Sequence, residues 1–217
     1  MLLVLQQSGA LSGKALGAEG DRIANDFLIG SLLLSRRKDA ILSEEAKDDL
    51  GRLSASRVWI IDPLDGTREF SEGRSDWAVH VGLAIDGVAA VGAVALPGLG
   101  LTLCSGQPRT LGALTSPLRM LVSRTRPARE AIHVAQALGA ELFPMGSAGA
   151  KAMAVVRGEA DIYLHTGGQY EWDNCAPVAV AAAAGLHVSR ADGAPLRYNN
   201  RDTSLPDLLI CRPELAD

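Results

Sequence analysis

Hydrophobic residues early in the chain recur first with helical and then with strand spacing. Residues 1–5 are apolar and predict part of an incomplete first helix. Between residues 20 and 34, apolar side chains return about every 3.6 positions, which predicts a helix with one buried face. Short apolar runs at 40–42 and 58–61 are bounded by charged or turn residues, and they predict interior strands.

Two longer apolar runs then surround a turn signal. Residues 77–85 and 88–96 are rich in β-forming residues and flank Asp86-Gly87, one of the strongest short signals for a two-residue hairpin. This segment therefore predicts an antiparallel ribbon.

The second half of the chain alternates between strand-like and helix-like segments. We expect strands at 119–122, 141–143, 162–165 and 186–189. We expect helices at 128–138, 148–156 and 175–184. The predicted fold is therefore mixed α/β, with an antiparallel meander packed against an α/β portion. Its lobes, residues 1–115 and 116–217, are expected to form one compact unit.

Composition narrows the classes of function. The chain has 217 residues, 47% of them apolar and 21% charged, as expected of a folded globular protein. A net charge of −4 leaves no basic surplus for a nucleic-acid polymer or an anionic membrane. No apolar run approaches the roughly 20 residues of a membrane span. Three widely spaced cysteines fit neither a disulfide framework nor a zinc site, so we expect a cytoplasmic protein.

The segment 59–70 carries the most chemistry, because an apolar strand ends there in two carboxylates. Asp62 and Asp65 are separated by Pro63, which fixes φ, and are followed by Gly66, which permits close backbone approach. Both carboxylates and the Leu64 carbonyl could then point to one hard cation such as Mg²⁺. The alternative is that Asp-Pro and Asp-Gly mark ordinary turns.

Two further acidic clusters favour the metal interpretation. Glu44 and Glu45 follow the strand predicted at 40–42, and Glu171 and Asp173 precede an apolar, Ala-rich helix. Each cluster alone could serve as a helix cap with first-turn acids. The chain, however, has no cationic cluster of similar density along its sequence. Carboxylates gathered in a partly buried site repel one another, and divalent cations relieve that repulsion.

These motifs resemble those of a known family. Ser43-Glu44-Glu45, the segment 59–70 and Glu171-Trp172-Asp173 are similar to the signature of the lithium-sensitive, Mg²⁺-dependent phosphatases, which include inositol monophosphatase, fructose-1,6-bisphosphatase and 3′(2′),5′-bisphosphate nucleotidase. Segments 146–151 and 158–165 resemble the CysQ-type nucleotidases, in particular their actinobacterial branch. The resemblance implies a layered α-β-α-β-α sandwich, here expected to be cut short at its terminal helices.

The resemblance also implies a ligand set for two or three Mg²⁺ ions. The first ion would be held by Glu44, Asp62 and the Leu64 carbonyl. A second would be held by Asp62, Asp65 and Asp173. Asp21 would lie near a third, although its lead-in differs from the family pattern and a helix N-terminal acid is the alternative. Catalysis would use Thr67 and Glu44 to orient a water, and the amides of Gly66 and Thr67 to hold the phosphate.

Contacts with the rest of the substrate are expected from four further side chains. These are Ser147, Lys151, His165 and Glu171. The alternatives are, in order, a helix cap, a solvated lysine, a polar strand end and a surface acid. Arg68 is an additional candidate, with a surface charge as its alternative.

The function implied by the resemblance is hydrolysis of 3′-phosphoadenosine 5′-phosphate to AMP and phosphate, in sulfate assimilation. An inositol monophosphatase or a broad sugar-phosphate phosphatase, acting for instance on fructose 1,6-bisphosphate, is the alternative within the class, since the metal site does not distinguish them. A catalytically silent metal-dependent binding protein is the alternative from another class. The expected partner is a small phosphorylated nucleotide or sugar, and a homodimer is compatible with the resemblance.

Overall fold

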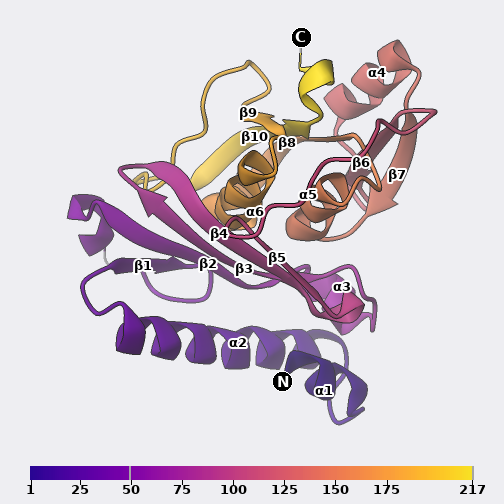
Figure 1. The fold of residues 1–217 in the computed structure, drawn as a ribbon. Helices are drawn as coiled ribbons and strands as arrows, with labels where there is room; N and C mark the ends of the chain where they lie inside the picture. Colours follow the sequence, from indigo (N-terminus) through magenta and orange to yellow (C-terminus); the bar gives the residue numbers. More distant parts are fainter. Residues whose placement is uncertain (49, 217) are drawn as a thin grey trace.

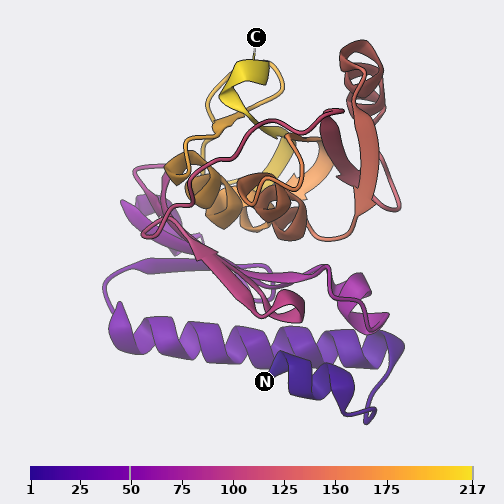
Figure 2. The same ribbon diagram turned by 45° about the vertical axis from the view of Figure 1, so that its right-hand side comes forward.

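The chain folds into five alternating layers of helix and sheet. The structure, a computed structural model, describes residues 1–48 and 50–216. Helices α1 (Leu2–Gln7) and α2 (Gly13–Ser35) form the first layer, below the first sheet (Figure 1). Helices α5 (Ala148–Val156) and α6 (Glu171–Ala183) lie between the two sheets, and α4 (Arg129–Leu138) covers the outer face of the second sheet (Figure 2). This arrangement confirms the mixed α/β class.

The first sheet has the strand order β1-β2-β3-β4-β5. Its strands are β1 (Ala40–Ser43), β2 (Arg57–Asp65), β3 (Ala78–Ile85), β4 (Val88–Leu96) and β5 (Leu101–Cys104). β1 and β2 are parallel and the other pairs are antiparallel. Asp86 and Gly87 both have positive φ, 50° and 77°, as a tight two-residue hairpin turn requires. The predicted ribbon is therefore confirmed.

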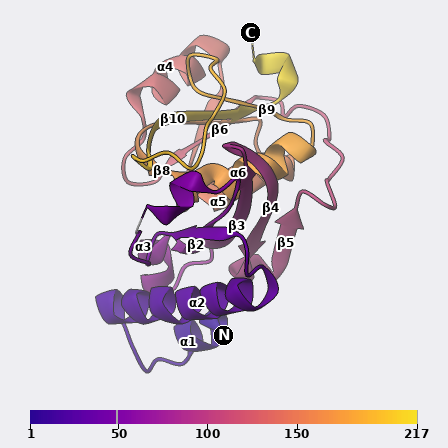
Figure 3. The same cartoon turned by 90° about the vertical axis from the view of Figure 1, so that its left-hand side faces the viewer.

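The second sheet has the order β7-β6-β8-β10-β9. Its strands are β6 (Arg119–Ser123), β7 (Glu141–Met145), β8 (Ile162–Tyr170), β9 (His187–Ser189) and β10 (Ser204–Cys211). β6 is parallel to both β7 and β8, whereas β10 is antiparallel to β8 and β9. Figure 3 shows this sheet on the opposite side of α5 and α6 from the first sheet.

Three hydrophobic clusters hold the layers together. The largest lies between the two sheets and is built mainly from Ala, Val, Leu and Ile. Smaller clusters join α1 and α2 to the first sheet and α4 to the second. Small residues let α6 approach the first sheet closely: a Cβ at Gly92 would lie 2.4 Å from the Ala176 carbonyl oxygen, and one at Gly82 would lie 2.9 Å from the Ala176 nitrogen. Side chains at either glycine would push the layers apart.

Several boundaries differ from the sequence-based expectation. Helix α2 begins at Gly13 and α6 at Glu171, both earlier than predicted. Pro177 lies inside α6, and because proline is favoured in the first turn of a helix, the pattern suggests a later start there. Helix α3 (Thr67–Ser71) and strands β5 and β10 were not predicted. Within 1–48 and 50–216, no helix is both long and apolar enough to cross a bilayer.

Candidate functional site

Two carboxylates at the end of β2 meet one from the first turn of α6. One ligand oxygen from each of Asp62, Asp65 and Asp173 lies within 4.8 Å of the other two. In a regular strand, residues three apart point to opposite faces. The β2–β3 register shifts between Asp62 and Asp65, where Pro63 lacks the N–H that a ladder needs. This irregularity lets both carboxylates reach the same point.

The cluster contains carboxylates without cationic partners. Asp62 is buried, and burial first, followed by the charges of Asp65 and Glu44, raises its pKa well above its ordinary value. Burial and the charge of Asp65 likewise raise the pKa of Asp173 to about 7. Among the described residues, no lysine or arginine forms an ion pair with Asp62 or Asp173. Backbone amides supply part of the compensation: Leu64 N–H donates to Asp62 over 3.0 Å and Tyr170 N–H to Asp173 over 2.6 Å.

Glu44 and Asp21 extend the acidic cluster towards its rim. Glu44 is exposed in the turn after β1, and its carboxyl group is within hydrogen-bond reach of that of Asp62. Partial burial and the charge of Glu45 raise the pKa values of both Glu44 and Asp21 to about 7. Thr67 Oγ1 donates to the Leu64 carbonyl over 3.0 Å and lies 3.4 Å from Asp21 Oδ1. The segment around the end of β2 therefore also contacts helix α2.

Asp65 differs from the other aspartates because donors surround it. The Ser147 hydroxyl donates to Oδ2, Gly149 N–H donates to the same oxygen over 2.7 Å, and Ala148 N–H donates to Oδ1 over 3.1 Å. The Nε2 atom of His80 lies 3.1 Å from Oδ2. Burial alone would raise the pKa of Asp65, but the nearby His80, the hydrogen bond from the Ser147 hydroxyl and the charge of Lys151 lower it to about 2.

The donor set fits a hard divalent cation. Asp62, Asp65, Asp173 and the adjacent Glu44 offer only oxygen atoms, which Mg²⁺ prefers. Burial first, and then the charges of neighbouring carboxylates, raises the pKa values of Glu44, Asp62 and Asp173, and a bound cation would offset both effects. Neither a thiol nor an imidazole belongs to the cluster of three aspartates. The arrangement therefore suits Mg²⁺ better than zinc.

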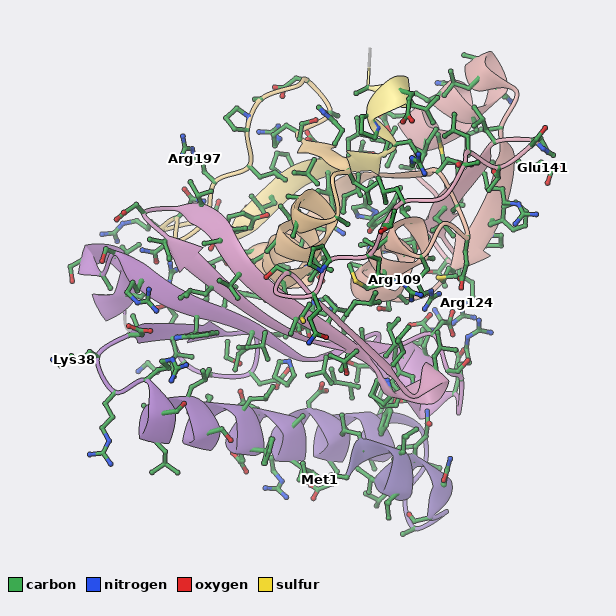
Figure 4. The ribbon with its side chains drawn as sticks, in the orientation of Figure 1. Met1, Lys38, Arg109, Arg124, Glu141 and Arg197 are labelled. Atoms are coloured by element: carbon green, nitrogen blue, oxygen red, sulfur yellow. The ribbon has the colours of Figure 1, made fainter. Side chains whose placement is uncertain are left out.

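A cationic cavity of about 520 Å³ opens beside the acidic cluster. Its lining residues are Arg68, Glu69, Ser123, Arg124, Thr125, Arg126, Gly146, Ser147 and Lys151. In Figure 4, Arg124 lies where α3 approaches the second sheet. Its guanidinium is 2.8 Å from Glu69 and 2.9 Å from Glu72. The fold thus gathers basic residues that are scattered along the sequence.

Lys151 and Ser147 connect this cavity to Asp65. Lys151 is buried, and its Nζ donates to the carbonyls of Gly146, over 3.2 Å, and Ser147, over 2.5 Å. Ser147 accepts from Ala150 N–H over 2.9 Å, so it caps α5 while its hydroxyl donates to Asp65. The alternative of a solvated lysine is therefore wrong, whereas the helix-cap interpretation of Ser147 is correct but incomplete.

Gly66, Arg68 and His165 lie around the same region. Gly66 has a φ of 86°, and a Cβ there would come within 3.2 Å of the Ser147 Cβ. Arg68 lines the cavity, although it also pairs with Glu72 at 2.9 Å. His165 is half-buried, and burial, followed by the nearby charge of Lys151, lowers its pKa.

Glu171 is placed differently from the expected substrate contact. Its side chain is fully buried. The carboxylate accepts hydrogen bonds from the backbone N–H groups of Asn199, over 2.7 Å, and Asn200, over 2.8 Å. In this structure Glu171 holds the 199–200 loop and does not present its carboxylate to the cavity. Neither a substrate contact nor the alternative of a surface acid describes this arrangement.

Sequence reasoning missed three residues that shape the site. His80 lies on β3, within the apolar run of the hairpin, and carries no motif of its own. Arg124 and Arg126 follow β6 in the run Ser123-Arg124-Thr125-Arg126. Two arginines directly after a predicted strand are a signal that could have been weighed, since strand ends commonly carry binding residues in α/β folds.

An acidic cluster beside a cationic cavity is the arrangement expected of an enzyme that holds a divalent cation and a phosphate ester. The inositol monophosphatase family matches residues 4–212, and the chain belongs to that family.

Relatives within this family carry more particular names. A protein of Mycobacterium leprae named 3′-phosphoadenosine 5′-phosphate phosphatase is 50% identical, over 100% of this chain and 85% of its own length. A protein of Mycobacterium tuberculosis with the same name is 53% identical, over 93% of this chain and 79% of its own length. The crystal structure of CysQ from Bacteroides thetaiotaomicron has a TM-score of 0.82 at 24% identity and covers 97% of this chain and 91% of that one. This last similarity supports the fold.

Proposed function

We propose that this chain is a Mg²⁺-dependent phosphomonoesterase that hydrolyses 3′-phosphoadenosine 5′-phosphate to AMP and phosphate. The observation that carries the proposal is the pairing of an acidic cluster with a cationic cavity that shares Ser147 with it. A substrate with two separate phosphates would place the reacting one at the acidic cluster and the other in the cavity. The names of the two mycobacterial relatives support this substrate.

The acidic cluster would hold two or three Mg²⁺ ions. Glu44, Asp62 and the Leu64 carbonyl would bind one, and Asp65 and Asp173 would share a second with Asp62. Asp21 would lie near a third. When bound, Mg²⁺ supplies Lewis acidity that lowers the pKa of water and offsets the charge of the phosphate.

Protein groups next to the cluster would orient the reactants. The Thr67 hydroxyl, held between Leu64 and Asp21, can accept a hydrogen bond from a water and so direct it towards phosphorus. Glu44, at the exposed rim, can take the proton of that water. The first-turn amides of α3 have no intrahelical acceptor and can donate to the phosphate oxygens.

The cationic cavity would bind the second phosphate. Arg126 is exposed there, and Lys151 and Ser147 line the inner wall. Burial first, and then the charges of Lys151 and Arg126, lowers the pKa of His165. The positive charges of Lys151 and Arg126 would attract a phosphate. Selection of a bisphosphate over a monophosphate would therefore depend on this cavity.

The two lobes would divide these tasks. Residues 1–115 supply Glu44, Asp62, Asp65 and Thr67, and residues 116–217 supply Asp173 and much of the cavity wall. We also propose that the enzyme works in the cytoplasm, since its three cysteines are free thiols.

The proposal is tested by comparing phosphate release from three substrates. We expect a higher kcat/KM for 3′-phosphoadenosine 5′-phosphate than for inositol 1-phosphate or fructose 1,6-bisphosphate at equal Mg²⁺. Equal or better turnover of either sugar phosphate would overturn the nucleotide preference. Binding of Mg²⁺ and nucleotide without any turnover would favour the silent-binder alternative.

A further inference from the structure

His80 lies where three elements of the site meet. It comes from β3, and its side chain is fully buried. The Nδ1 atom lies 3.0 Å from the carbonyl oxygen of Trp172, in the first turn of α6. The Nε2 atom lies 3.1 Å from Asp65 Oδ2, although this contact is not aligned as a regular hydrogen bond. One imidazole ring thus spans from Asp65 to the residue directly before Asp173.

The space around the ring fixes its position. A Cβ at Gly149 would lie 2.0 Å from Nε2, and the three atoms nearest to that Cβ all belong to His80. Gly149 also donates its N–H to Asp65 Oδ2. The first turn of α5 therefore packs directly on the ring and on the same carboxylate oxygen. Without a side chain at Gly149, the ring fits between α5 and Asp65.

These contacts join two segments that bear expected metal ligands. Asp65 ends β2 in the first sheet, and Asp173 lies at the start of α6, between the sheets. Nothing in the chain connects these positions locally, since more than a hundred residues separate them. Groups that contact metal ligands from outside the coordination sphere orient those ligands, and their substitution typically lowers metal affinity by about 10- to 100-fold.

We propose that His80 is a positioning residue that sets the separation of Asp65 and Asp173 and thereby the affinity of the site for divalent cations. The proposal rests on the proposed function in one respect, namely that the acidic cluster binds such a cation. Gly149 contributes to the same positioning role because its lack of a side chain leaves room for the imidazole ring.

The first test measures binding of Mn²⁺ alone by electron paramagnetic resonance, without substrate. His80→Ala is expected to weaken Mn²⁺ binding by about 10- to 100-fold. His80→Asn retains a donor near Nδ1 and His80→Gln one near Nε2, so each is expected to bind with intermediate affinity. The control His133→Ala changes an exposed histidine on α4 and should bind as the wild type does.

Activity provides a second readout that a purely structural role would not produce. Raising Mg²⁺ should restore most of the kcat of His80→Ala, while KM for the nucleotide stays near that of the wild type. Circular dichroism establishes whether each variant is folded. If His80→Ala is not folded, the same measurements on His80→Asn and His80→Gln test the proposal.

The third test uses Gly149. In wild-type background, Gly149→Ala should displace the ring and weaken Mn²⁺ binding about as much as His80→Ala does. In the His80→Ala background the same substitution should add little, because the clashing ring is gone. Additive effects would overturn the role of Gly149.

The outcomes separate this inference from the proposed function. If the wild type binds no Mn²⁺, the proposed function fails. If the wild type binds Mn²⁺ and folded His80→Ala binds it within about twofold, the proposed function stands and the positioning role of His80 is overturned.

Discussion

The acidic cluster and the cationic cavity lie side by side but satisfy their charges in different ways. Asp62 and Asp173 have no cationic side chain in an ion pair among the described residues. In the cavity, by contrast, Arg124 pairs with Glu69 and Lys151 donates to backbone carbonyls, while Arg126 is exposed. The charges of the acidic cluster are therefore left largely uncompensated by protein side chains, whereas those of the cavity are partly compensated.

This difference suggests which part of the site is general and which is specific. The acidic cluster supplies the chemistry common to phosphate-ester hydrolysis. Under the proposed function, the cavity would contact the part of the substrate that does not react. Changes on the acidic side should therefore affect all substrates, and changes in the cavity should affect only those with a second phosphate.

The largest expected effect comes from Asp62→Asn. Loss of a carboxylate shared by two expected metal positions should reduce kcat/KM by at least about a thousandfold for every phosphate ester, since a metal contributes several kcal/mol to the transition state. Phosphate release at saturating Mg²⁺ measures the loss. The control Asp26→Asn changes an exposed aspartate on α2 and should have little effect. Activity of Asp62→Asn within tenfold of wild type would contradict the metal assignment.

Removal of metal should make stability depend on pH. The pKa values of Asp21 and Asp173 are raised to about 7, mainly by burial, so the folded chain binds more protons than the unfolded chain between about pH 4 and 7. Linkage then lowers the free energy of unfolding as the pH rises through this window.

Thermal unfolding in EDTA at pH 5 and pH 8 measures this dependence. We expect a lower Tm at pH 8, and a larger increase in Tm on adding Mg²⁺ at pH 8 than at pH 5. The lowered pKa of Asp65 acts in the opposite direction but only below about pH 4, outside the interval compared. A metal-free Tm that is equal or higher at pH 8 would contradict unpaired carboxylates in the cluster.

Arg126→Ala should distinguish the role of the cationic cavity from that of the acidic cluster. Loss of a charged hydrogen bond to the second phosphate should raise KM for 3′-phosphoadenosine 5′-phosphate by about tenfold. KM for inositol 1-phosphate should change little, because that substrate lacks a second phosphate. Steady-state kinetics with both substrates measures the contrast, and Arg129→Ala on α4 serves as the matched control. Equal changes in both KM values would remove the distinction between the two sides.

The smallest effect on activity is expected for Glu171→Gln. Three donors face this carboxylate, from the Asn199 and Asn200 backbones and the Asn200 side chain, and an amide would oppose one of them. We expect a loss of about 1–3 kcal/mol in unfolding free energy with an unchanged KM. Urea denaturation and nucleotide kinetics test this together. A raised KM with normal stability would indicate instead that Glu171 contacts the substrate.

Local sequence patterns predicted much of the fold because the conformation of a single helix or hairpin depends largely on residues that are close in sequence. The hairpin at 77–96 and helix α5 follow from alternation, a turn dipeptide and helical spacing. Strand β10 was missed because Pro206 interrupts its run, which lowers its resemblance to an interior strand.

Local sequence patterns predicted proximity within the site only for residues that are close in sequence, whereas the joining of Glu44 and Asp173 to this site was implied by the resemblance. Asp62 and Asp65 share one strand end, so their proximity could be expected. The contact of His80 with Asp65 and the gathering of Arg124 with Lys151 depend on how layers pack, and no local pattern encodes that packing. Burial of Glu171 under the 199–200 loop is likewise a tertiary effect.

The most direct test of a metal-dependent site built from the acidic cluster and the cationic cavity is a Mg²⁺ titration of phosphate release from 3′-phosphoadenosine 5′-phosphate, starting from EDTA-treated protein. The account predicts no release in EDTA, saturable activation by Mg²⁺, and AMP as the nucleotide product. Release that persists undiminished in EDTA would contradict it.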